Sequence, residues 1–182
     1  MIAYDLIGQT PLVLLESFSD ENVKIYAKLE QFNPGGSIKD RLGKYLIEKA
    51  IDEGRLKEGD TIVEATAGNT GIGLAIASNR HKVKCIIFAP EGFAEEKISI
   101  MKALGADVRR TPKAEGMTGA QQEALAYATR YGYLYMNQFE TKDNPGAYTQ
   151  TLAKQLTDEL SHIDYFVAGV GSGGCLLYTS DA

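Results

Sequence analysis

The chain has 182 residues, of which 44% are hydrophobic and 24% charged, and its formal net charge is −5. This composition is typical of a globular protein. The negative charge argues against nucleic acid or an anionic membrane as the main partner. No apolar run approaches the roughly 18 residues of a membrane span, and residues 1–5 lack the basic and apolar regions of a secretion signal. Because the two cysteines and two histidines have no metal-ligand spacing, we expect a cytoplasmic protein that binds no metal.

The first half of the chain alternates between predicted strands and helices. Residues 23–30 alternate apolar and polar side chains, which indicates a half-buried strand. After the Pro34-Gly35-Gly36 turn, an apolar stripe predicts a helix over residues 38–53 that Gly54 ends. A short apolar strand at 61–65 then leads through a glycine-rich loop into a helix of small residues at 72–79.

The second half continues the alternation. The sequence predicts strands at 83–89, 106–110, 133–136 and 164–170, and helices ending near Leu104 and over 119–130 and 146–160. The strand at 164–170 (DYFVAGV) is almost wholly apolar, which predicts burial on both faces. Strands and helices at this spacing form βαβ units, so we expect an α/β protein with a parallel sheet that binds ligands at the carboxyl ends of its strands.

One lysine lies in an unusual context, in residues 33–41 (NPGGSIKDR). Ser37 is a good N-cap, and Asp40 three residues later completes a pattern similar to a capping box. Lys39 would then lie at the positive end of a helix dipole, which disfavours its ammonium form. A lysine with a depressed pKa suits Schiff-base chemistry; the alternative is an ordinary solvated lysine.

The loop at residues 66–71 (TAGNTG) consists of small residues and compact hydrogen-bonding residues between a strand and a helix. Such a loop offers N–H groups to a phosphate or carboxylate. A tight turn that needs glycine for backbone reasons alone would have the same composition. Gln138 and Phe139, between a strand and a helix, either face the same crevice or form an ordinary loop.

A second glycine-rich segment, residues 169–174 (GVGSGG), matches the dinucleotide pattern G-x-G-x-x-G. This match alone raises the alternative of an NAD(P)-dependent oxidoreductase. The segment falls after several earlier strands, and the acidic residue expected about 20 positions later would lie beyond Ala182. A phosphate cup for another cofactor fits equally well.

Taken together and in this order, residues 33–41, 66–73 and 169–174 resemble the cysteine synthase and cystathionine β-synthase group of fold type II pyridoxal-phosphate enzymes. Residues 7–12 (IGQTPL) and 102–106 (KALGA) are also similar to that family. The resemblance covers residues 4–174 and implies a two-lobed fold with pyridoxal 5′-phosphate between the lobes.

The resemblance also implies a role for each motif. Lys39 would form the Schiff base with the cofactor, and Asn69 would bind the cofactor's phenolic oxygen. The phosphate would be bound by Gly171, Ser172, Gly173 and Gly174. The substrate carboxylate would be bound by Thr66, Gly68, Asn69, Thr70 and Gln138.

The implied reaction is a β-replacement on O-acetylserine or a related activated serine, with sulfide as acceptor, as in a cysteine synthase. Ala67 stands where many cysteine synthases have serine, and with residues 115–117 (EGM) it is similar to a branch that makes cystathionine from homocysteine. Cystathionine synthesis is therefore the near alternative. Substrate binding would close the carboxylate loop and keep water from the reacting group.

We expect residues 1–36 to belong to a large lobe, 37–145 to form a small mobile lobe, and 146–174 to start the rest of the large lobe. Residues 175–182 (CLLYTSDA) depart from the family and resemble translated adapter sequence, so we expect a foreign tail on a truncated chain. The large lobe would then be incomplete, without the serine that usually faces the pyridine nitrogen. The full-length parent would be a homodimer, and an inactive fragment is a further alternative for this chain.

Overall fold

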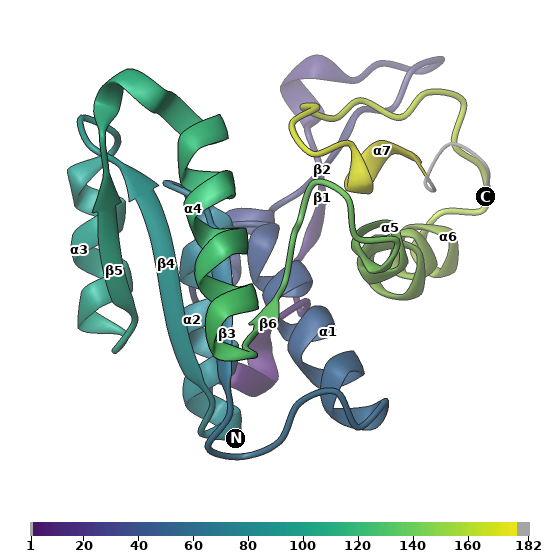
Figure 1. Ribbon diagram of the computed structural model, residues 1–182. Helices are drawn as coiled ribbons and strands as arrows, with labels where there is room; N and C mark the ends of the chain where they lie inside the picture. The colour runs from purple at the N-terminus through teal and green to yellow at the C-terminus, as the bar shows by residue number, and fades with distance from the viewer. Residues whose placement is uncertain (1, 178–182) are drawn as a thin grey trace.

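The computed structural model describes residues 2–177. Its main sheet has four strands, β3 (Thr61–Ala65), β4 (Lys84–Pro90), β5 (Asp107–Thr111) and β6 (Leu134–Tyr135). They lie in the order β5-β4-β3-β6, and every neighbouring pair is parallel (Figure 1). The prediction of an α/β fold with a parallel sheet is therefore confirmed.

Helices cover both faces of this sheet. One face packs against α4 (Gly116–Tyr131) through Val63, Ala65, Ile86 and Phe88. The other face, with Ile62 and Ile87, shares a core with α1 (Lys39–Asp52), α2 (Asn69–His81) and α3 (Glu95–Ala103). Both faces of β3 and β4 are thus buried, as their nearly continuous apolar sequences predict.

Two glycines allow α1 and α2 to pack closely. A Cβ on Gly43 would overlap the backbone of Gly73 and Leu74, and a Cβ on Gly73 would overlap the backbone carbonyl of Lys39. Neither backbone can yield as a flexible side chain can, so both positions need glycine. This contact brings the start of α1 beside the start of α2.

The remaining elements form a second part beside the sheet (Figure 1). The strands β1 (Leu12–Leu14) and β2 (Tyr26–Lys28) form an antiparallel pair. A long helix consists of α5 (Asp143–Tyr148), a π-helical turn (Thr149–Ala153) and α6 (Lys154–Glu159), and α7 (Gly174–Leu177) follows later. Short 3₁₀ helices occur at Glu16–Phe18 and Glu30–Phe32. Two further 3₁₀ helices belong with the sheet and its helices: Ala3–Leu6 contacts α2, and Lys113–Glu115 connects β5 to α4.

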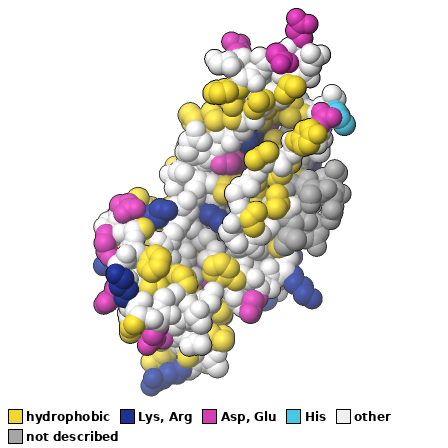
Figure 2. Space-filling view, turned by 90° about the horizontal axis from the view of Figure 1, so that it is seen from above, with side chains coloured by type: hydrophobic (Ala, Val, Ile, Leu, Met, Phe, Trp, Pro, Cys, Tyr) yellow, Lys and Arg dark blue, Asp and Glu magenta, His cyan; other side chains and the backbone are white. Residues whose placement is uncertain are grey.

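The predicted buried strand at residues 164–170 is wrong. The segment forms no regular element and pairs with no strand among the described residues, and Tyr165 and Val167 are 90% and 93% exposed. Figure 2 shows hydrophobic side chains exposed in several places on the face seen from above. An apolar sequence forms a buried strand only where a neighbouring strand receives its hydrogen bonds, and the described chain offers none here.

Smaller differences concern element ends. The predicted strand at 23–30 is limited to β2, α2 begins three residues earlier than predicted, and the helix predicted at 146–160 begins at Asp143. Of the predicted foreign tail, Cys175 to Leu177 belong to α7, and residues 178–182 lie outside the described residues.

No helix in the described part is long and apolar enough to cross a membrane.

Candidate active site

Lys39 lies in the first turn of α1, as predicted, and is its first residue, but the predicted capping box does not form. The Ser37 hydroxyl accepts a hydrogen bond from the Lys39 amide (3.2 Å), whereas the Asp40 carboxylate turns back to accept one from the Gly35 amide. The Pro-Gly-Gly turn is therefore fastened to α1 by Asp40. Burial raises the pKa of this carboxyl group to about 6.

The Lys39 side chain lies where the two parts of the molecule meet, and the region around its amine is called the crevice below. Its Nζ is 3.2 Å from the Tyr148 hydroxyl on α5 and 3.2 Å from the Ser172 hydroxyl. Burial lowers the pKa of Lys39 below its ordinary value, with a smaller opposing effect from Cys175. The expected direction of the pKa shift is confirmed, and burial is its main cause.

The loop at residues 66–71 follows β3 at its carboxyl end, where ligands of parallel sheets bind. Gly71 needs its small size for packing, because a Cβ there would overlap the Met101 sulfur. Gly68 has no such constraint, since a Cβ there would meet no atom within 4 Å. Gly68 thus faces open space, and the Asn69 side chain makes no hydrogen bond to another described residue.

Gln138 lies just beyond β6, the neighbour of β3 in the sheet. It is 5% exposed, and its side-chain oxygen accepts a 2.6 Å hydrogen bond from the Thr70 hydroxyl. Two residues predicted to act on one carboxylate are thus in contact, although they are 68 positions apart in the chain. Phe139, by contrast, is largely exposed.

The segment at residues 169–174 lies on the opposite side of the crevice from the strand ends. Ser172 accepts hydrogen bonds from Lys39 and, at 3.0 Å, from the Asn144 side chain. Gly173 has a φ of +78°, which favours glycine, and a Cβ on Gly174 would overlap Asn144. No strand leads directly into this segment, since residues 160–168 form no regular element, so it lacks the strand–turn–helix setting of a dinucleotide fingerprint.

Three buried residues of this region were missed from the sequence: Tyr148, Asn144 and Glu64. Asn144 donates to the Gln138 carbonyl (2.7 Å) and to Ser172, and so joins the two halves of the crevice. Glu64 was detectable, because it is the one charge within the apolar run of β3. Tyr148 carried no sequence signal, since a tyrosine on an amphipathic helix usually belongs to the core.

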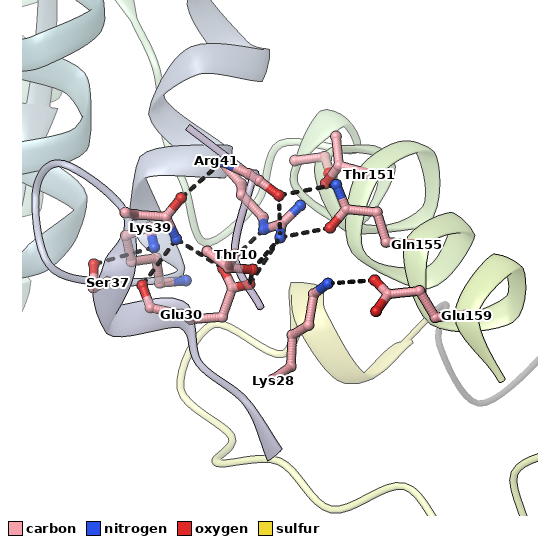
Figure 3. Close-up of polar contacts among 12 residues, drawn as sticks. Thr10, Lys28, Glu30, Ser37, Lys39, Arg41, Thr151, Gln155 and Glu159 are labelled. Atoms are coloured by element: carbon pink, nitrogen blue, oxygen red, sulfur yellow. Dashed lines mark hydrogen bonds and ion pairs between the residues drawn. The ribbon is translucent and has the colours of Figure 1, made fainter. Parts of the chain in front are cut away.

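A buried ion pair fixes the N-terminal segment behind Lys39 (Figure 3). The Arg41 guanidinium, 2% exposed, contacts the Glu30 carboxylate at 2.8 Å and also donates to the Gly8 carbonyl, Thr10 and Gln155. A second pair, Lys28 with Glu159 (2.9 Å), joins β2 to α6. The motif at residues 7–12 is therefore bound to the start of α1 through Arg41.

The fold and this crevice define a class of protein. A crystal structure titled O-acetylserine dependent cystathionine beta-synthase from Helicobacter pylori superposes with a TM-score of 0.92 at 44% identity, covering 100% of this chain and 62% of that one. The architecture, a parallel α/β sheet with a half-buried lysine beside it, is that of fold type II pyridoxal-phosphate enzymes.

The chain belongs to the pyridoxal-phosphate dependent enzyme family, whose model matches residues 3–177. It is 49% identical over 179 residues to an O-acetylserine dependent cystathionine beta-synthase of Bacillus subtilis and 46% identical over 185 residues to a cysteine synthase of Helicobacter pylori. These matches cover 97% of this chain but only 58% and 59% of the two relatives. The chain thus spans a little over half the length of these curated relatives.

The residues of the crevice fit the family's cofactor. Its aldehyde needs an amine with a lowered pKa, which Lys39 supplies. Its phosphate needs backbone N–H groups that are not crowded by side chains, and a Cβ on Gly171 would meet no atom within 4 Å. Ser172 follows Gly171 in the chain, and its hydroxyl lies within hydrogen-bond distance of the Lys39 amine.

Proposed function

We propose that this chain carries the lysine and the substrate-carboxylate loop of a pyridoxal-phosphate enzyme that performs β-replacement on O-acetylserine or a related activated serine, with sulfide as the acceptor. The observation that carries the proposal is the 3.2 Å contact between the Lys39 amine and Ser172. This contact links the reactive group to the predicted phosphate segment. The two relatives named above support the same class of reaction.

Lys39 would bind the cofactor covalently and, once displaced by the substrate amine, would accept the substrate α-proton. A half-buried amine suits both tasks, because its lowered pKa increases the fraction that is neutral. When bound, the cofactor supplies an electron sink for the carbanion that this proton transfer creates. The Tyr148 hydroxyl, in contact with the same Nζ, would hold the freed amine in place.

The substrate carboxylate would be bound by Thr66, Gly68, Asn69, Thr70 and Gln138. A Cβ on Gly68 would meet no atom within 4 Å, although the Gly68 amide donates to the Thr66 hydroxyl at 3.2 Å. The amide of Asn69 lies in the first turn of α2. The Thr70 hydroxyl, which donates a hydrogen bond to Gln138 in this structure, can turn toward a carboxylate when one is present. Asn69 would also donate a hydrogen bond to the phenolic oxygen of the cofactor, and residues 171–174 would bind its phosphate.

Homocysteine is the second candidate for the acceptor. Ala67 lacks the hydroxyl that many cysteine synthases have at this position, and the Bacillus subtilis relative is an O-acetylserine dependent cystathionine beta-synthase. To decide between them, purified protein with pyridoxal phosphate and O-acetylserine is given sulfide or homocysteine at equal concentration, and the products are separated by chromatography. Faster cysteine formation supports the first candidate, and faster cystathionine formation supports the second.

The wider setting is also part of the proposal. Residues 37–145 would form a small lobe that closes on the substrate, with residues 1–36 and 146–174 in the large lobe. The complete protein would be a cytoplasmic homodimer that acts on small molecules. Sedimentation of the complete protein, with and without O-acetylserine, tests both the dimer and the closure. Resequencing the gene tests whether residues 175–182 are foreign.

A further inference from the structure

A buried acid, Glu64, lies beneath the candidate carboxylate loop, and none of the roles above uses it. It is the fourth residue of β3, is fully buried (0% exposed), and has its backbone paired opposite Ile87 of β4. An acidic side chain is almost never fully buried without a partner. Its contacts therefore indicate what it does.

Both oxygens of Glu64 accept hydrogen bonds from backbone amides at strand ends. One binds the amide of Ala65, the last residue of β3, at 2.8 Å. The other binds the amide of Gln138, beyond β6, at 3.1 Å. The side chain thus ties together the two loops that carry the proposed carboxylate-binding residues.

Gln138, whose amide is bound by Glu64, accepts two further hydrogen bonds from other residues of the region. Its side-chain oxygen accepts from Thr70 at the start of α2. Its backbone carbonyl accepts from the Asn144 side chain, which in turn donates to Ser172, and Ser172 contacts Lys39. A continuous series of hydrogen bonds between described residues therefore runs from Glu64 to the reactive amine.

We propose that Glu64 is a positioning residue that holds Gln138, and through it Thr70, in the geometry that binds the substrate carboxylate. This inference rests on the proposed function for the identity of the ligand. Glu64 acts through the two amides that it accepts, those of Ala65 and Gln138. Glutamine cannot replace it fully, because the NH₂ group of glutamine only donates, whereas each oxygen of a carboxyl group, protonated or ionised, can accept a hydrogen bond.

The first test compares the unaltered protein with Glu64→Gln by amide hydrogen exchange, without cofactor. We expect exchange at the Ala65 or Gln138 amide to accelerate about tenfold or more, since one of them loses its acceptor. Val63→Ala is the matched control, because it opens a small cavity on the same strand without touching the network. Unchanged protection at both amides in Glu64→Gln, or equal acceleration in Val63→Ala, would overturn the proposal.

The second test adds pyridoxal phosphate and titrates O-acetylserine. Glu64→Gln should retain the absorbance band of the lysine Schiff base and need about tenfold more O-acetylserine to shift it. Thr70→Val should need a similar excess while the Gln138 amide stays protected, so the inference can still be judged if Glu64→Gln folds poorly. An unchanged titration in both variants contradicts the inference. Absence of the band in the unaltered protein would count against the proposed function, and amide exchange would still decide on Glu64.

Discussion

The side-chain amine of Lys39 lies 3.2 Å from the Ser172 hydroxyl, although 133 positions separate the two residues in the chain. The contact joins the start of α1 to a glycine-rich segment that belongs to no sheet among the described residues. It places the candidate imine-forming group next to the candidate phosphate site. Most of the predictions below test whether this juxtaposition serves the cofactor.

Removing the Ser172 hydroxyl should weaken cofactor binding. In Ser172→Ala, Lys39 and Asn144 both lose a hydrogen-bond partner, and we expect the dissociation constant for pyridoxal phosphate to rise about tenfold. Fluorescence titration measures this constant. Ser161→Ala, at an exposed serine of the preceding segment, is the control and should bind normally. Equal affinity in both variants would show that Ser172 does not contact the cofactor.

The Tyr148 hydroxyl should influence the reactivity of Lys39. It accepts a hydrogen bond from Nζ, which favours the ammonium form. Tyr148→Phe should therefore lower the pKa of Lys39 further, so that acetylation of this amine, followed by mass spectrometry, becomes faster at neutral pH. Tyr26→Phe, on the exposed side of β2, serves as the control. A slower reaction in Tyr148→Phe would show that the hydroxyl favours the neutral amine instead.

The close approach of α1 and α2 should not tolerate a methyl group. Gly73→Ala would force a Cβ against the Lys39 carbonyl, and we expect the free energy of unfolding to fall by about 1–3 kcal/mol in urea denaturation. Gly169→Ala, where a Cβ meets no atom within 4 Å, should change it by less than about 0.5 kcal/mol. A stable Gly73→Ala variant would mean that the two helices can separate freely.

Burial raises the pKa of Glu64 from 4.5 to about 8, against the opposing effect of two backbone hydrogen bonds. The pKa of Glu64 in the folded state lies above its value in the unfolded state. Between pH 4.5 and pH 8 the folded protein therefore binds more protons than the unfolded chain, and the free energy of unfolding falls as the pH rises through this range. Asp40 acts in the same direction up to about pH 6. The nearby Cys85 and Tyr135 have raised pKa values and stay neutral throughout.

Glu64→Gln should therefore remove most of the decline in stability between about pH 6 and pH 8. Urea denaturation at several pH values measures the free energy of unfolding for both proteins. Glu58→Gln, at an exposed carboxylate paired with Lys82, is the control and should keep the decline. Parallel pH curves for the unaltered protein and Glu64→Gln would show that Glu64 titrates normally.

The parallel sheet could be predicted because its strands are short apolar runs separated by helical periods, and the paired helices cover both faces. Lys39 and the two glycine-rich segments could be singled out because glycine and capping residues constrain the backbone locally. Residues 164–170 could not be predicted correctly, since their apolar pattern says nothing about whether a neighbouring strand exists. The hydrogen bonds of Asn144 with Ser172 and of Tyr148 with Lys39 could not be predicted either, because they depend on how α5 packs against the crevice.

The central claim is that Lys39 is the residue that binds pyridoxal phosphate. The most direct measurement is the absorbance spectrum of the purified protein with pyridoxal phosphate, compared with Lys39→Ala and with Lys24→Ala, an exposed lysine, as the control. We predict a Schiff-base band in the unaltered protein and in Lys24→Ala, and its loss in Lys39→Ala. A band of equal strength in Lys39→Ala would contradict the assignment.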